Sequence, residues 1–201
     1  MKRLWLLLVL LAAGCTEPAP RVTHAGPFPG RIVLMPLNNH SNNMLGPLLV
    51  RKLLELHLAG SGYNPMGAKD VDTRLNSIGI TDGGQLGAIP PAKVGEVMGA
   101  DGILYGELLQ FGYTNLGVYN KRIVEVRLFL VQASTGLTIW DSTRKGTTTK
   151  IGLDADAIKE NFVVGLVEKY AETILRNPLR PEAETAVQAL VKDLNRARNN
   201  W

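Results

Sequence analysis

Residues 123–132 carry the pattern that most constrains the fold. Val124, Val126, Leu128 and Leu130 alternate there with Glu125 and Arg127. Side chains of a β-strand point alternately to its two faces, so the pattern predicts an antiparallel strand with one buried and one solvated face. Residues 134–136 then predict a hairpin turn in which Gly136 supplies a positive φ, and residues 137–149 predict the return strand.

The residues before this hairpin predict the element order β-α-β-α-α and a further strand. Residues 31–37 form a short apolar run typical of a buried strand, and leucines at helical spacing predict a helix over 45–60. Residues 62–66 are a candidate second strand, and residues 68–79 a candidate helix. Pro90 and Pro91 open a short helix that ends near Gly99. Residues 101–113 predict the first strand of the meander, with bulges or bends at its glycines.

Two amphipathic helices are predicted at the end of the chain. Apolar stripes run over residues 158–174 and 183–194, and Pro181 opens the second helix. We expect both helices to pack on the sheet, with docking to a partner protein as the alternative. The chain is therefore predicted to be α+β: a mixed sheet with a βαβ start, a right-handed crossover and an antiparallel meander, and helices packed on it.

The N-terminal segment indicates export. Lys2 and Arg3 precede ten apolar residues, 4–13. This stretch is too short to cross a bilayer, which takes about 20 helical residues. It has the length of the apolar core of a signal peptide. The stretch leads to Leu11-Ala-Ala-Gly-Cys15, and Cys15 is the single cysteine of the chain.

The sequence around Cys15 resembles a bacterial lipobox. The resemblance implies cleavage before Cys15, acylation of this residue, and anchoring in a membrane. The next residue is Thr16 rather than Asp, which resembles the sorting pattern of outer-membrane lipoproteins in Gram-negative bacteria. An ordinary secretory signal with a chance cysteine is the alternative.

These features divide the chain into three parts. Residues 1–14 are the predicted lipoprotein signal peptide. Residues 15–30 hold the lipidated cysteine and four prolines, and they predict an extended tether of up to ~45 Å. Residues 31–201 are predicted to form a single periplasmic α+β domain.

Charge and motifs favour a protein that is not an enzyme. The chain has 22 Lys+Arg and 18 Asp+Glu, which is too small a basic excess for nucleic-acid binding. It contains no nucleophile elbow, no phosphate-binding loop and no paired-histidine zinc motif. We therefore expect no catalytic residue, no metal and no cofactor, and we keep an unrecognised cell-wall hydrolase as the enzymatic alternative.

One polar loop is the candidate site for a ligand or a partner. It consists of Asn38, Asn39, His40, Ser41, Asn42 and Asn43. The loop follows the first strand at the carboxyl edge of the sheet, where α/β folds often bind ligands. The simpler interpretation is that these residues form turns and cap the next helix, with Asn38 and Asn39 as the caps.

Basic residues gather near the end of the chain. They are Arg176, Arg180, Lys192, Arg196 and Arg198. A solvated helix face that complements the helix dipole is the ordinary interpretation. Contact with anionic lipid head groups is the alternative.

Three segments, together with the lipobox, resemble a family of bacterial lipoproteins. They are Ile32-Val-Leu-Met-Pro-Leu-Asn-Asn39, Gly99-Ala-Asp-Gly-Ile-Leu-Tyr-Gly106 and Ser134-Thr-Gly-Leu-Thr-Ile-Trp-Asp141. More distantly, their order resembles the periplasmic domain of the curli secretion lipoprotein CsgG and the amino-terminal domain of TolB. The resemblance covers residues 31–149 and implies a periplasmic domain involved in envelope assembly or export, with no catalytic residue.

The anchor, the tether and the missing catalytic motifs together predict a function. We expect an outer-membrane-anchored periplasmic lipoprotein that acts as a scaffold or accessory subunit. Its partners would be the membrane, through Cys15, and other envelope proteins or further copies of itself. A periplasmic small-ligand-binding module that uses residues 38–43 is the alternative.

Overall fold

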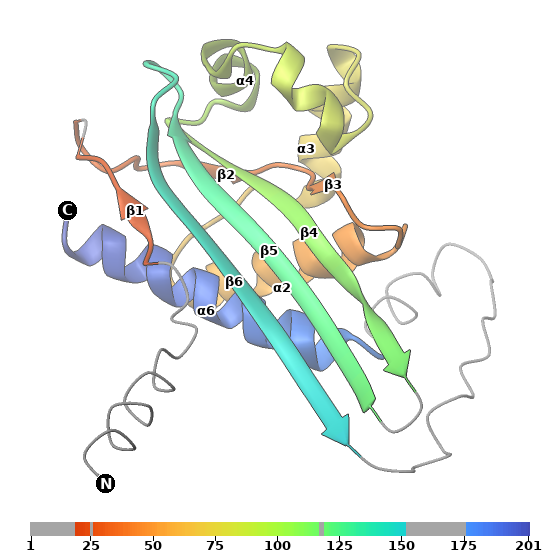
Figure 1. Cartoon of the computed structure of the whole chain (residues 1–201). Helices are drawn as coiled ribbons and strands as arrows, with labels where there is room; N and C mark the ends of the chain where they lie inside the picture. The colour runs from red at the N-terminus through yellow and green to blue at the C-terminus, as the bar shows by residue number, and fades with distance from the viewer. Residues whose placement is uncertain (1–18, 25, 117–118, 152–175) are drawn as a thin grey trace, which may run out of the picture.

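The computed structural model describes residues 19–24, 26–116, 119–151 and 176–201 of the chain (Figure 1). In these ranges no helix is both long and apolar enough to cross a membrane. The predicted helix over 158–174 lies outside the described residues.

A six-stranded mixed sheet forms the centre of the domain, in the order β1-β6-β5-β4-β2, with β3 beside β4. The strands are β1 Arg21–Val22, β2 Ile32–Leu34, β3 Asn38–Asn39, β4 Gly102–Leu116, β5 Tyr119–Gln132 and β6 Thr138–Ile151. β2 and β3 run parallel to β4. β4, β5 and β6 form an antiparallel meander. The predicted α+β class and the mixed sheet are thus confirmed.

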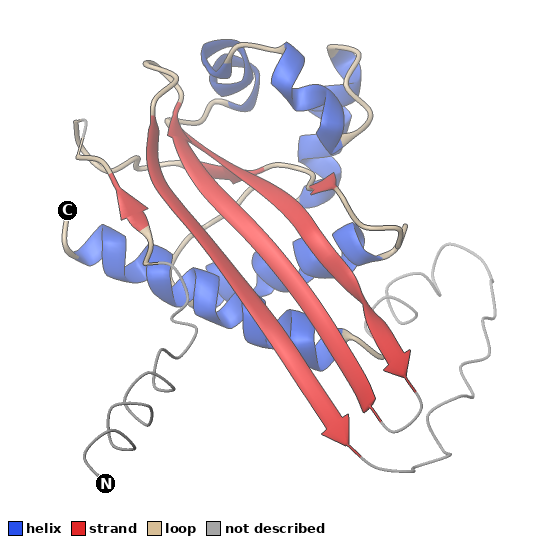
Figure 2. Cartoon of the chain, in the orientation of Figure 1, coloured by secondary structure: helices blue, strands red, loops and turns tan. Residues whose placement is uncertain are grey.

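Helices cover both faces of this sheet (Figure 2). α2 (Gly46–Gly60) and α6 (Arg180–Asn199) pack on one face. Leu49 and Leu53 of α2 and Leu190 of α6 are buried there with Leu128 and Trp140 of the sheet, while Leu48 and Leu56 of α2 are exposed. α3 (Ala68–Ser77), the short 3₁₀ helix η2 (Gly83–Ala88) and α4 (Pro91–Met98) lie on the other face beside β2. They share a second core with Val33 and Ile103.

The pattern in β5 is confirmed residue by residue. Val124, Val126, Leu128 and Leu130 are all fully buried. Gly136 has φ 71° in the β5–β6 turn, as predicted. The irregularity in β4 falls between Leu108 and Gln110 rather than at its glycines.

Two of the β4 glycines are required by packing instead. A Cβ at Gly102 would lie 2.7 Å from Pro29 Cβ, and one at Gly106 would lie 2.8 Å from Leu37 Cγ. The missing side chains therefore make room for neighbouring segments.

The predicted strand over 62–66 is wrong. The structure has a turn and an irregular connection there. Gly62 has φ 79°, and Pro65 has no N–H to offer a strand partner. The ring of Tyr63 instead lies 4.4 Å from the guanidinium carbon of Arg198.

The segment predicted as a free tether is docked over much of its length. Arg21 and Val22 pair antiparallel with Asp141 and Trp140 of β6. Farther along, Trp201 Nε1 donates a hydrogen bond of 2.7 Å to the carbonyl of Gly26. Composition alone cannot reveal that the edge of β6 is available for pairing, so the proline content suggested a longer tether than the structure shows.

Buried polar contacts fix α6 to β6. Arg144 Nη2 lies 2.7 Å from Asp193 Oδ2, and Ser142 Oγ donates to the same carboxylate oxygen over 2.9 Å. Both Ser142 and Asp193 are buried. At Gly146 the strand has no side chain, and the backbone of Glu182 occupies the place where a Cβ would stand.

Candidate functional site

The face of β4, β5 and β6 opposite α2 and α6 carries the candidate site, and we call it the outer sheet face. Leu104 and Leu108 of β4 point into the core shared with α2 and α6. The alternation of strand side chains therefore puts Tyr105 and Glu107 on the opposite side. Both residues are half-buried.

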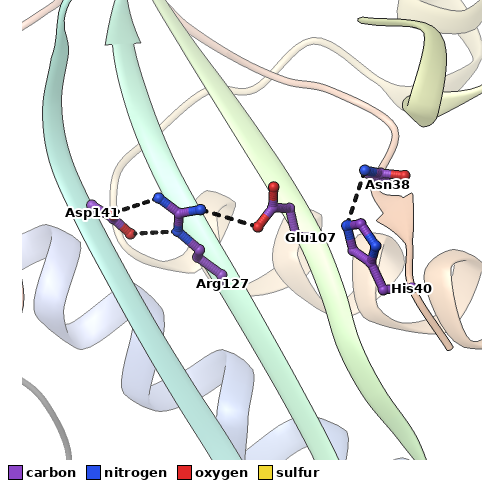
Figure 3. Close-up of polar contacts among 5 residues, drawn as sticks. All are labelled: Asn38, His40, Glu107, Arg127 and Asp141. Carbon is purple, nitrogen blue, oxygen red and sulfur yellow. Dashed lines mark hydrogen bonds and ion pairs between the residues drawn. The ribbon is translucent and has the colours of Figure 1, made fainter. Parts of the chain in front are cut away.

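Three charged side chains form a row across this face (Figure 3). Arg127 of β5 donates from Nε to Asp141 Oδ1 over 3.0 Å and from Nη2 to Asp141 Oδ2 over 2.7 Å. Its Nη1 donates to Glu107 Oε2 over 3.2 Å. One guanidinium thus links β4, β5 and β6, and the bidentate pair with Asp141 is the strong geometry for such a contact.

Aromatic rings extend the row along the strands. The guanidinium of Arg127 lies 5.1 Å from the ring centre of Phe129, within the range of a cation–π contact. Tyr105 stacks on Phe129 with 5.4 Å between ring centres. The result is a preformed surface of rings and charges.

The electrostatics of this surface favour fixed charges. The pKa of Arg127 is raised, and the largest cause is its hydrogen bonding to Asp141. Desolvation opposes this rise, while the negative charges of Asp141 and Glu107 add to it. Burial raises the pKa of the Tyr105 phenol. The guanidinium therefore stays positive, and the phenol stays neutral at neutral pH.

The outer sheet face combines paired charges with aromatic rings. Arg127 is held by two carboxylates, those of Glu107 and Asp141. Among the residues that the structure describes, no group of three or more His, Cys, Asp or Glu side chains is placed to hold a metal. Half-exposed aromatic and arginine side chains are typical of protein interfaces.

The polar loop lies at one end of the same row. Asn38 of β3 is the register partner of Glu107 in β4. The side-chain amide of Asn38 lies 3.0 Å from His40 Nε2, and Figure 3 shows this pair beyond Glu107. The structure therefore places Asn38 and His40 near the charged row.

The polar side chains of the next loop residues make hydrogen bonds within the loop or to the residues that follow it. Asn39 Oδ1 accepts from the backbone N–H and the hydroxyl of Ser41, at 3.1 and 2.8 Å. Asn43 Oδ1 accepts from the backbone N–H groups of Leu45 and Gly46, at 3.0 and 2.8 Å. The N-cap residue of α2 is Leu45, which makes no side-chain cap hydrogen bond. Asn43, rather than the predicted Asn38 and Asn39, reaches the helix from two residues before the N-cap and accepts from the free N–H of Gly46. Asn42 is exposed.

A hollow of about 610 Å³ lies away from this loop. Its walls include Phe28, Arg31, Gly95 and Asp101. The residues of 38–43 do not line it. This hollow therefore does not support the ligand-binding hypothesis for the loop, which stays a hypothesis.

The structure adds two residues that the sequence did not single out, Glu107 and Asp141. Arg127 was assigned to the solvated face by alternation, but its partners depend on strand register. Cys15, the predicted lipid anchor, lies outside the described residues.

Together, the βαβ start, the meander and the helices on both faces define an α+β domain also seen in solved structures. Lipoprotein GNA1162 from Neisseria meningitidis aligns with TM-score 0.56 and 20% identity, over 65% of this chain and 86% of that one. PelC from Paraburkholderia phytofirmans aligns with TM-score 0.52 and 13% identity, over 88% and 94%.

The chain belongs to the GNA1162-like family, described as "Putative lipoprotein GNA1162-like", which matches residues 25–198. A relative from Neisseria meningitidis serogroup B, "Putative lipoprotein NMB1124/NMB1162", is 22% identical over 79% of each chain. The expected lipoprotein family is thus confirmed. The more distant likeness to CsgG and TolB stays a resemblance of sequence motifs.

Proposed function

We propose that this protein is a periplasmic lipoprotein of the outer membrane that serves as a non-enzymatic scaffold or accessory subunit in envelope assembly or export. Cys15 carries the lipid, and Thr16 directs the protein to the outer membrane. Membership of a lipoprotein family supports the anchor. The lipobox supports the choice of Cys15.

The outer sheet face carries the proposal for the partner-binding role. Its charged row is rigid because Arg127 is tied to strands on both sides. The aromatic rings of Tyr105 and Phe129 lie beside it and are partly buried, Tyr105 against the second core. A partner can bury these rings without reorganising the surface, which lowers the entropy cost of binding.

Further copies of the chain are a second class of partner. In the described residues, β6 has a strand on its outer edge only at Trp140 and Asp141, where β1 pairs. β4 has outer neighbours only up to Leu108. Open edges of this kind accept strands from other chains. The PelC structure is a dodecamer, which supports self-association as a use of this fold.

A pull-down of the full-length, lipidated protein from gently solubilised membranes tests the proposal. We expect a discrete complex that contains envelope proteins or several copies of the chain, and we expect Cys15→Ser to lose it. A clean monomer in both samples would contradict the scaffold function.

Two matched variants test the outer sheet face. Glu107→Gln removes one carboxylate from the row but keeps the Arg127–Asp141 pair. Glu96→Gln removes a carboxylate from an exposed pair with Lys93 on α4. We expect Glu107→Gln to weaken the complex and Glu96→Gln to leave it intact. Equal recovery with both variants would place the interface elsewhere.

A further inference from the structure

The docked N-terminal segment leaves little chain between the domain and its anchor. The described chain begins at Ala19, just before β1. Cys15 lies four residues earlier, and four extended residues span at most about 14 Å. If Cys15 is lipidated, as proposed above, the surface around Ala19 is therefore held close to the membrane.

The C-terminal half of α6 lies beside that point. Arg21 of β1 pairs with Asp141, and the next residue of β6, Ser142, donates to Asp193 of α6. Two residues after β1, the ring of His24 lies 4.7 Å from that of Trp201, the residue that follows the end of α6 by two. Figure 1 shows β1 next to the last turns of α6.

The solvent-facing side of α6 carries positive but no negative charge. Its exposed ridge, which we call the α6 ridge, consists of Pro181, Thr185, Gln188, Lys192, Arg196 and Asn199. These positions are three or four apart, so they lie along one side of the helix.

The acidic residues of α6 are buried or paired. Glu182 and Asp193 are only 3% and 5% exposed, and Asp193 Oδ1 lies 3.8 Å from Arg196 Nη1. Glu184 is paired with His57 of α2 and accepts a hydrogen bond from Gln188. The exposed cations Lys192 and Arg196 stand at the anchored end of the helix.

We propose that the α6 ridge lies against anionic lipid head groups beside the anchor. Each cation close to an anionic lipid surface increases partitioning of the protein onto that surface about fivefold. The short link from Cys15 keeps these residues within reach of the head groups. Because α6 and the outer sheet face lie on opposite sides of the sheet, this contact turns the outer sheet face away from the membrane, toward partners.

Single-cysteine labelling tests this orientation on the full-length, lipidated protein. The mature chain has no free thiol once Cys15 is acylated, so a new cysteine is a unique reporter. A fluorophore is placed at Asn199→Cys on the α6 ridge or at Gln110→Cys of β4, an exposed position opposite Glu125 on the outer sheet face. The protein is reconstituted in phosphatidylcholine vesicles, with or without phosphatidylglycerol, that carry a head-group quencher.

We expect several-fold stronger quenching at position 199 than at 110 in vesicles that contain phosphatidylglycerol. The double change Lys192→Gln with Arg196→Gln should shift the equilibrium between the membrane-bound and the detached ridge about 25-fold toward the detached state, because each lost cation weakens membrane binding about fivefold. The quenching at 199 should fall accordingly. Lys69→Gln with Lys93→Gln removes the same charge from exposed positions of α3 and α4 and should change nothing.

Three results would overturn the inference: equal quenching at the two positions, stronger quenching at 110, or no effect of the Lys192 and Arg196 changes. Failure of the anchor itself is separate, because the unlabelled protein would then not float with the vesicles. The orientation is read only from protein that floats.

Discussion

A methyl group at Gly146 should separate α6 from the sheet. An ideal Cβ there would lie 1.9 Å from the carbonyl oxygen of Glu182, 2.6 Å from its carbonyl carbon and 2.8 Å from its Cα. Real Cβ atoms essentially never approach other atoms closer than 3.0 Å, so strand and helix must part by about 1.1 Å. The obstacle is helix backbone, which no rotamer change can move.

The cost follows from what this shift disturbs. Overpacking a core costs about 1–3 kcal/mol when neighbours can adjust. Here the first turns of α6 carry the fully buried Ala183 and Ala186, so we expect Gly146→Ala to lower the free energy of unfolding by about 3 kcal/mol. With a urea m-value of about 2 kcal/mol per M, the midpoint should fall by about 1.5 M.

Gly112→Ala is the matched control in the same sheet. A Cβ at Gly112 meets no atom within 4 Å. Its effect should therefore stay within about 1 kcal/mol. Urea unfolding followed by tryptophan fluorescence measures both variants. If Gly146→Ala unfolds at the same urea concentration as Gly112→Ala, the close packing of α6 on β6 is refuted.

Three further predictions concern the outer sheet face, the pH dependence and the start of α2. Arg127→Met should cost about 1–2 kcal/mol, because the pair with Asp141 is bidentate but partly exposed, and a double-mutant cycle with Asp141→Asn measures the coupling. Burial raises the pKa of Tyr105 above 10.0, so the unfolded chain ionises first and stability should fall as the pH rises above about 10. Tyr105→Phe should reduce this fall in urea titrations, while Tyr63, whose pKa burial also raises, keeps part of it. Asn43→Ala should lower the thermal midpoint, at a cost of about 1 kcal/mol for the lost hydrogen bonds at the start of α2.

The candidate site could be predicted only in part. Alternation in β5 placed Arg127 on the solvated face, because side-chain direction along a strand is a local property. Its partner Asp141 comes from β6, 14 residues away in the sequence. That contact depends on strand register, which is set by the packing of both strands together. The loop at 38–43 was visible as a run of polar residues, but which asparagine reaches the start of α2 depends on the path of the backbone.

The sequence by itself determined the elements whose causes are local. The apolar alternation of β5, the positive φ at Gly136 and the proline at the start of α4 were all read correctly, because each depends on neighbouring residues. Tertiary structure decided what depends on distant residues. Part of the Pro-rich N-terminal segment pairs with the edge of β6 as β1. Farther along, Trp201 donates a hydrogen bond to the carbonyl of Gly26, 175 residues away in the sequence. Such contacts form only when the sheet and α6 are already in place, so composition and periodicity cannot reveal them.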